Sequence, residues 1–249
     1  MAIIKNPLII IKGGESKLPQ VIDKTVTEIT AEDLAGATSI GAKVFYNCRE
    51  LISIEIPDGV TEIRQEAIAA CGKLTTVIIP DSVKSIGGYA FQSCSKLTTI
   101  NIPNNVTVLS SYVFAYCSSL PTITLPNSIT NILNNAFDNC TSLTEITIPS
   151  SVIKISGKAF YHCSSLTSIT IPSSVTSIGS SCFESCSSLT EITILATTPP
   201  TLVSANAIST ATTTIYIPAG TLEAYQSATN WSNFADIFVE LNEDGTKPK

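Results

Sequence analysis

Apolar residues return along this chain at a fixed interval of 23 residues, with polar residues between them. Cysteines set the frame, and coil positions are counted from them below: Cys48, Cys71, Cys94, Cys117, Cys140, Cys163 and Cys186. Leucine stands at +3, Ile or Val at +6, Ile or Leu at +8, Pro at +9 from Pro57 to Pro172, and Phe or Ile at −3. A period of 20–50 residues indicates one supersecondary unit stacked on copies of itself, so the pattern predicts a solenoid.

Each repeat contains two short extended segments. In Leu166–Pro172, apolar residues at 169 and 171 alternate with threonine, which is the pattern of a strand with one buried face. Proline cannot donate to a sheet ladder, so the +9 column marks where the strand leaves the sheet. Turn-forming residues follow, and Val175–Ile178 returns as a second extended segment.

These elements predict a right-handed solenoid of the α/β class, mostly β, with a parallel sheet, about eight coils and an atypical cap at each end. The predicted cap strands are Leu8–Lys12, Val26–Ile29 and one or two within Val203–Ile217, and Thr221–Ser227 is a helix with Thr221 as N-cap. Trp231, Phe234 and Phe238 are expected to cover the last coil. The predicted divisions are 1–39 (lead-in and cap), 40–195 (solenoid), 196–241 (cap) and 242–249 (disordered tail).

Composition excludes two classes of partner. The net charge of −6 and the pI near 4.8 argue against nucleic acid, because phosphate binding needs clustered Lys and Arg. No apolar run approaches the ~18–20 residues that span a bilayer. Met1–Ile11 lacks the features of a signal peptide, which leaves three alternatives: a removed signal, another export route, or a protein that stays inside the cell.

The cysteines are predicted to be buried, reduced thiols rather than disulfides or metal ligands. Seven belong to the repeat, and Cys182 stands in a column otherwise held by Ala and Val. Parallel side-chain vectors on adjacent coils have the wrong geometry for disulfides. Cys182 and Cys186 are four residues apart with no histidine at zinc-site spacing, so we expect no metal and no cofactor.

Catalytic chemistry finds little support in the sequence. His162 is the single histidine, and its column otherwise holds Asn, Ala, Ser and Tyr, as a variable surface position does. Neither a repeated carboxylate pair nor a glycine-rich phosphate loop is present. We therefore expect a protein that is not an enzyme; a hydrolase would require His162.

The outward columns of the first strand, +5 and +7, are the best candidates for ligand binding. Most of their residues are Thr or Ser, which are also ordinary solvated strand residues. The predicted ligand-binding residues in these columns are Glu55, Ile78, Asn101, Thr124, Glu145 and Glu191. A second candidate is the tyrosine group Tyr89, Tyr112 and Tyr116, which lies off the strand.

The repeat C-x-x-L-x-x-I-x-I-P-x-x-V-x-x-I-x-x-x-A-F-x-x over residues 40–195 resembles the Treponema-type leucine-rich repeat of BspA-like bacterial surface proteins. The segment after Ala196 is similar to the C-terminal cap of many such proteins. Residues 17–34 resemble the lead-in of related proteins in gut Firmicutes, some of them encoded in prophages. The resemblance implies adhesion or ligand binding through a curved sheet, without catalysis.

We therefore predict an extracellular or cell-surface module that binds a protein or glycan on another surface, with an undetermined oligomeric state. The alternative is a virion tail or receptor-binding protein that assembles through Met1–Lys24, where Leu8–Ile11 forms an apolar patch. A remote alternative is ice binding, because Thr122-Ile-Thr124 places two threonines on one strand face.

Overall fold

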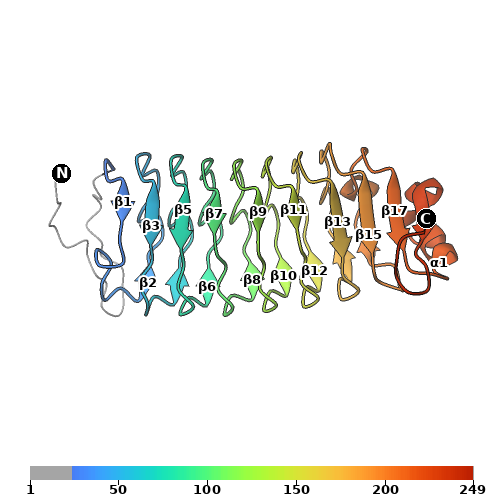
Figure 1. The fold of residues 1–249 in the computed structure, drawn as a ribbon, viewed down its shortest axis with the longest axis horizontal. Helices are drawn as coiled ribbons and strands as arrows, with labels where there is room; N and C mark the ends of the chain where they lie inside the picture. The colour runs from blue at the N-terminus through green and yellow to red at the C-terminus, as the bar shows by residue number, and fades with distance from the viewer. Residues whose placement is uncertain (1–23, 249) are drawn as a thin grey trace.

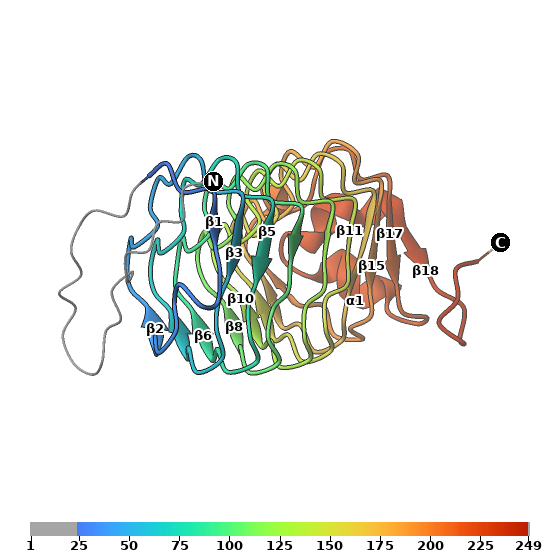
Figure 2. The ribbon, with the colours of Figure 1, turned by 60° about the vertical axis from the view of Figure 1, so that its left-hand side comes forward.

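The computed structural model describes residues 24–248, which form a stack of about nine turns along one long axis (Figure 1). The first row of strands comprises β1 Glu28–Ile29, β3 Ser53–Glu55, β5 Thr76–Ile78, β7 Thr99–Ile100, β9 Thr122–Ile123, β11 Glu145–Ile146, β13 Ser168–Ile171, β15 Glu191–Ile194, β17 Thr214–Ile217 and β18 Phe238–Glu240. The second row, shown beside the first in Figure 2, comprises β2 Ser39–Ile40, β4 Glu62–Ile63, β6 Ser85–Ile86, β8 Val108–Leu109, β10 Asn131–Ile132, β12 Lys154–Ile155, β14 Ser177–Ile178 and β16 Thr201–Leu202. The helical elements are η1 Ala205–Ala207, α1 Leu222–Ser227 and η2 Trp231–Ile237.

Strands of successive coils pair in parallel, so the predicted columns become rows across the sheets. Ile54 pairs with Val77, for example, and Ile155 with Ile178. The first row consists of three blocks, β1-β3-β5-β7, β9-β11 and β13-β15-β17-β18; the second consists of β2-β4-β6 and β8-β10-β12-β14-β16. The interruption between β7 and β9 coincides with Pro121, which stands where other coils have a residue that donates an N–H to the previous coil.

The core is the continuous interior of the stack. Every leucine of the +3 column has no exposed surface, and the phenylalanines from Phe91 to Phe183 stack on one another with ring centroids 5.3–5.6 Å apart. Parallel offset rings at this spacing add attraction beyond the burial of their apolar area. The hydrophobic columns therefore act as continuous ladders rather than as separate small cores.

The third side of each coil is a run of turns with an unusual backbone. Positions −5 and −1 have positive φ in every coil from that of Cys48 to that of Cys186, although their residues include Lys43, Tyr112 and His162. The N–H groups at −5, −3 and −1 donate to the next coil, as from Phe45 to the carbonyl of Ala67 (2.8 Å). Beside the strands, most of the bonds between coils run the other way, as from the N–H of Thr75 to the carbonyl of Ile52 in the previous coil (2.8 Å).

The cysteines are all free and buried, in agreement with the prediction of inward thiols. From Cys71 to Cys186, each thiol of the repeat column lies 3.0–3.3 Å from the carbonyl at position −3 of the previous coil, as Cys140 does with Phe114. A small apolar side chain with a weak donor suits this position, because it fills the core and also bonds a carbonyl. This contact gives a physical reason for cysteine rather than alanine in the column.

The 23-residue spacing continues beyond residue 195, where the sequence analysis ends the solenoid. Ile215 pairs with Ile192, and Phe238 pairs with Ile215 in turn. Ser209 and Thr212 stand 23 residues after Cys186 and Leu189 and donate their hydroxyls to the carbonyls of those residues. This continuation accounts for the additional turn, and the proposed divisions of the chain remain predictions.

Side chains from the last segments close the C-terminal end of the stack. Trp231 is buried and donates its indole N–H to the carbonyl of Pro200 (2.7 Å), as expected of an aromatic cover. Asn230 donates its amide to the carbonyl of Leu202 (2.7 Å), the last residue of the second row. The predicted N-cap is wrong in its chemistry: Thr221 makes no side-chain cap, and the carboxylate of Glu240 accepts the N–H groups of Thr221 and Leu222.

Two further expectations concern the ends of the chain. The predicted strand Leu8–Lys12 lies outside the described residues, whereas Val26–Ile29 contains β1 as predicted. Residues 242–247, predicted to be disordered, form a turn in which the N–H of Asn242 bonds the carbonyl of Thr246 (2.8 Å). Across residues 24–248, none of the helices has the length and apolar character needed to cross a membrane.

Candidate binding surface

The outward positions of the first row form one continuous surface, here called the sheet face. It consists of the +5 column (Ser53, Thr76, Thr99, Thr122, Glu145, Ser168 and Glu191), the +7 column (Glu55, Ile78, Asn101, Thr124, Thr147, Thr170 and Thr193), and Thr214 and Tyr216 of β17. Side chains alternate across a strand, so +5 and +7 point outward while +6 enters the core. All six residues predicted to bind a ligand lie on this face.

Hydroxyl groups on the sheet face differ from those elsewhere on the coil. At positions +1, +4, +11 and +13, most Ser and Thr hydroxyls donate to carbonyls of the previous coil, as Thr98 does to Thr75 (3.2 Å) and Ser174 to Val152 (2.7 Å). No hydroxyl of the +5 or +7 columns makes a hydrogen bond within residues 24–248. The hydroxyls of the sheet face therefore keep their donors and acceptors for solvent or a ligand.

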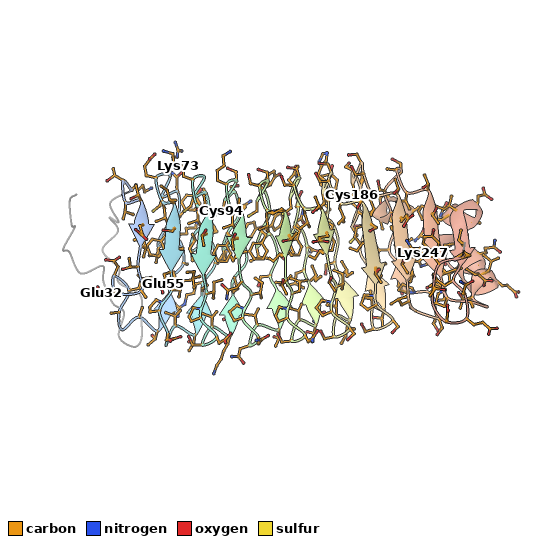
Figure 3. The ribbon with its side chains drawn as sticks, in the orientation of Figure 1. Glu32, Glu55, Lys73, Cys94, Cys186 and Lys247 are labelled. Atoms are coloured by element: carbon orange, nitrogen blue, oxygen red, sulfur yellow. The ribbon has the colours of Figure 1, made fainter. Side chains whose placement is uncertain are left out.

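The N-terminal part of the sheet face carries the clearest departure from small polar residues. Glu55 and Ile78 are partners in the register of β3 and β5, and the Ile78 side chain is 52% exposed. Ile52, at the +4 position just before β3, is 47% exposed and lies outside the two columns of the sheet face. On the sheet face, the carboxylate of Glu55 and the exposed side chain of Ile78 combine charge with apolar contact area (Glu55 is labelled in Figure 3).

Asn101 has a structural role in addition to its place on this face. Its amide accepts the N–H of Ile79 (3.0 Å) and donates to the carbonyl of Ile79 (2.6 Å). This pair of bonds closes the strand end of the neighbouring coil and uses one donor and one acceptor position of the Asn101 amide, which leaves the other two for a ligand. Thr124 and Glu145 are exposed and lack such ties among the described residues.

Glu191 is half-buried and forms an ion pair with Lys247, which the turn at 242–247 brings back onto the sheet face. The Lys247 ammonium also lies 4.5 Å from the ring centroid of Tyr216. Lys247 and Tyr216 were not among the residues predicted to bind a ligand. Tyr216 could have been found, because Ile215-Tyr216-Ile217-Pro218 keeps the Ile-x-Ile-Pro spacing; nothing in the sequence indicates where Lys247 lies.

The alternative tyrosine site lies on the turn side of the coils, away from the sheet face. Tyr89 and Tyr112 share the −5 column and stack with centroids 4.6 Å apart and planes 6° from parallel. Tyr116, at −1, is 47% exposed. The structure thus keeps the two candidate surfaces separate, with the aromatic one on the strained turns.

The described residues offer no assembled catalytic group. His162 is exposed and contacts the ring of Tyr161 edge-on at 5.0 Å, and residues 24–248 contain no group of three His, Cys, Asp or Glu side chains that could hold a metal. Burial raises the pKa of Cys117, Cys140 and Cys182 well above the ordinary value and that of Cys186 to about 12. These thiols are protonated at neutral pH and are poor nucleophiles.

Solved structures with the same architecture are leucine-rich repeat proteins. One from Bacteroides ovatus is 25% identical with a TM-score of 0.63; the match covers 89% of this chain, and the chain spans only 62% of that protein. A Treponema pallidum leucine-rich repeat protein is 30% identical over 69% of this chain and 76% of its own, with a TM-score of 0.56. A leucine-rich cell surface protein from Faecalibacterium prausnitzii shares the fold at 23% identity, covering 90% of this chain and 83% of its own with a TM-score of 0.56.

Sequence comparison gives the same assignment. No curated protein matches the chain significantly. The family model described as the BspA type leucine-rich repeat region matches six copies, over residues 23–140 and 107–234, and no catalytic family is indicated. These matches span the solenoid and most of its C-terminal cap, and they agree with the 23-residue columns and their burial. The chain belongs to the BspA-type leucine-rich repeat family.

Proposed function

We propose that this chain is a non-enzymatic binding module that attaches through its sheet face to a protein on another surface. The observation that carries the proposal is the difference in hydrogen bonding between the columns. Most Ser and Thr hydroxyls at +1, +4, +11 and +13 bond the neighbouring coil, with Thr107, Thr167, Thr190 and Thr197 as exceptions, whereas none at +5 and +7 does. Stacked coils present these free groups as one broad surface, which is how solenoids commonly bind partners.

A protein ligand is favoured over a glycan by the N-terminal part of the sheet face. The exposed Ile78 offers apolar contact area beside the carboxylate of Glu55, its partner in the register of β3 and β5. Apolar anchors surrounded by polar groups are typical of protein interfaces. A glycan remains an outcome of the binding screen described below.

The proposed location is the cell surface or the extracellular space. The similar F. prausnitzii protein is described as a cell surface protein, which supports this location by analogy. The virion alternative depends on Met1–Lys24, of which residues 1–23 lie outside the described part, and no observation favours it. Ice binding has little support, because the threonine rows are interrupted by Glu145 and Glu191.

The test is a binding screen followed by matched variants. The purified chain is screened against arrays of extracellular-matrix proteins and host glycans, and the affinity of each hit is measured by biolayer interferometry. The double variant Ile78→Glu/Glu145→Lys should weaken binding about tenfold or more, because the changes alter an exposed apolar group and a charge on the sheet face.

The matched control alters the turn side with changes of similar kind. Tyr116→Glu/Lys158→Glu replaces an exposed aromatic residue and an exposed charge there, and it should leave the affinity unchanged. Circular dichroism checks that both variants are folded. If the control weakens binding and the sheet-face variant does not, the ligand site lies on the tyrosine-bearing turns and the proposal is wrong.

A further inference from the structure

A lysine ammonium is held on the sheet face at its C-terminal end. Lys247 contacts the carboxylate of Glu191 and lies over the face of the Tyr216 ring, 4.5 Å from its centroid. Figure 3 places Lys247 against the last strands, far along the chain from the residues that hold it. A carboxylate combined with an aromatic face is a standard way to recognise an alkylammonium group.

Adjacent strands of the sheet build the two halves of this site. Glu191 begins β15, and Tyr216 lies on β17, where it is in register with Thr193. Both side chains therefore point outward and lie diagonally across two paired strands, within reach of one ammonium group. The solenoid fixes this arrangement before any cation arrives, because both strands belong to the regular ladder.

The segment that carries Lys247 is folded back by a closed turn. The carboxylate of Asp244 accepts the N–H (2.9 Å) and the hydroxyl (2.6 Å) of Thr246, and these bonds lower the pKa of Asp244. Gly245 supplies a positive φ of 78°. In Figure 1 the dark red loop returns across the front of the last strands.

Lys247 covers the sheet face where it contacts Glu191 and Tyr216. Both residues are partly exposed, whereas Ser168 and Thr170 on the preceding strand β13 are exposed. Ser53 and Thr76 are partly exposed as well, so the cover is defined by the two contacts of Lys247, which lie on β15 and β17.

The surrounding charge is acidic. Residues 159–246 contain seven carboxylate side chains and neither lysine nor arginine. Lys247 is the first lysine after Lys158, and Lys249 lies outside the described residues. A basic side chain of a partner that reaches this end of the sheet face is therefore attracted to it, and within residues 159–248 Lys247 is the single lysine that competes for the site.

We propose that Glu191 and Tyr216 form a binding site for a lysine side chain of the protein partner, and that Lys247 occupies this site in cis as a competitor. The proposal rests on the proposed function, since the site is part of the sheet face. Tethering gives Lys247 an effective concentration in about the millimolar range. An isolated lysine therefore competes poorly, and a partner that also contacts the open coils displaces Lys247.

The first experiment reads the occupancy by Lys247 directly. In the isotopically labelled full chain, the ring of Tyr216 should shift the Lys247 Hε resonances upfield. The shift should persist in Tyr216→Phe, which keeps the ring, and disappear in Tyr216→Ala. An Hε resonance at its ordinary position in the unaltered chain would overturn the occupancy in cis.

The second experiment tests the site for an external lysine. The probe is the peptide acetyl-Gly-Thr-Lys-Pro-amide, titrated into the full chain and followed by NMR. Lys247→Gln should bind the peptide about threefold more tightly than the unaltered chain, because the competitor is gone. The matched control Lys154→Gln, the same change at an exposed position of the second row, should not alter the affinity.

Adding Glu191→Gln or Tyr216→Ala to Lys247→Gln should abolish peptide binding. Equal affinity of Lys247→Gln and the unaltered chain, or binding that survives Glu191→Gln, would overturn the proposal. The proposed function is tested separately through Ile78 and Glu145, which lie outside the site. If those variants weaken ligand binding while the peptide fails to bind, the lysine site alone is wrong.

Discussion

The backbone hydrogen-bonding groups of the strands are paired both in the inner coils and at the C-terminal cap, but by different partners. Within the stack, the next coil bonds the backbone of each strand, as the N–H of Gly179 does with the carbonyl of Ile155 (2.8 Å). At the end of the second row no further strand follows, and the side-chain amide of Asn230 bonds the carbonyl of Leu202 instead. Side chains thus replace the missing coil at the open end.

The inner coils rely on contacts that are repeated along the chain, whereas the cap relies on contacts that are made once. The inner coils repeat one set of residue types, so each ladder contact occurs many times with small variations. The cap uses residues that each occur once, such as Trp231 on Pro200 and Tyr225 on the carbonyl of Ala196 (2.7 Å). We therefore expect inner substitutions to weaken the whole stack, and cap substitutions to open it from one end.

The largest expected effect is alkaline destabilisation of the inner coils, where all eight thiols lie. Burial raises the pKa of Cys186 to about 12, above the ordinary value of 9.0, so the native thiol keeps its proton while the unfolded thiol loses it. Stability is therefore complete below about pH 8.5 and falls as the pH rises toward 12, by up to about 1.4 kcal/mol per pH unit for each thiol whose pKa is raised in the folded protein. Urea unfolding at pH 8 and pH 10.5 measures the loss.

The thiols themselves provide the control for this prediction. The variant Cys117→Ala/Cys140→Ala should show a shallower fall of stability with pH, because two titrating groups are absent. A thiol reagent at pH 8 should label almost nothing in the native protein and all eight cysteines after denaturation. Rapid labelling of several cysteines in the native state would contradict the buried ladder.

The second prediction compares one aromatic residue from each region. Phe137→Ala and Trp231→Ala should each reduce the free energy of unfolding by about 3–5 kcal/mol, because each removes a fully packed ring. Hydrogen exchange should distinguish them. Phe137→Ala should increase exchange on both sides of its coil, and Trp231→Ala mainly from β16 to β18. Equal effects of both variants near β1 would contradict the division into stack and cap.

The third prediction concerns Asn230, which combines a side-chain bond with a φ of 67°. Asn230→Gly should cost about 1–2 kcal/mol, the typical loss when a buried carbonyl is left unpaired. Asn230→Ala should cost more, since alanine also tolerates positive φ poorly. Thermal unfolding of the three proteins measures both costs, and equal stability of the alanine and glycine variants would show that the backbone is free to relax.

The smallest effect is expected at the strained turns of the inner coils. Ala70 has a φ of 60°, whereas the neighbouring Ala69 is not among the residues with positive φ. Ala70→Gly should stabilise the protein by less than about 1 kcal/mol, because glycine adopts this conformation without strain. Ala69→Gly, the matched control, should destabilise it. Destabilisation by both variants would indicate that the left-handed turns carry little strain.

The sequence predicted which candidate residues share the sheet face more completely than it predicted the availability of each residue for contact. All six candidates lie on the sheet face, because alternation along a strand fixes their direction. The pattern did not indicate that Asn101 bonds the neighbouring strand end or that Lys247 covers Glu191. Both contacts depend on which side chains meet across coils or across a turn, and the period carries no information about single contacts.

The amino-acid sequence by itself determined the coil, its 23-residue length, the inward columns and the burial of the cysteines. Stacking is the arrangement that buries the same positions in every copy of a repeated unit, so the 23-residue period is sufficient to predict these features. Only the tertiary structure decided how the stack ends. Glu240 rather than Thr221 caps α1, Ser209 and Thr212 continue the columns with hydroxyls, and Lys247 returns to β15. The ends are made by contacts between segments far apart in the chain, and those contacts occur once and therefore leave no pattern.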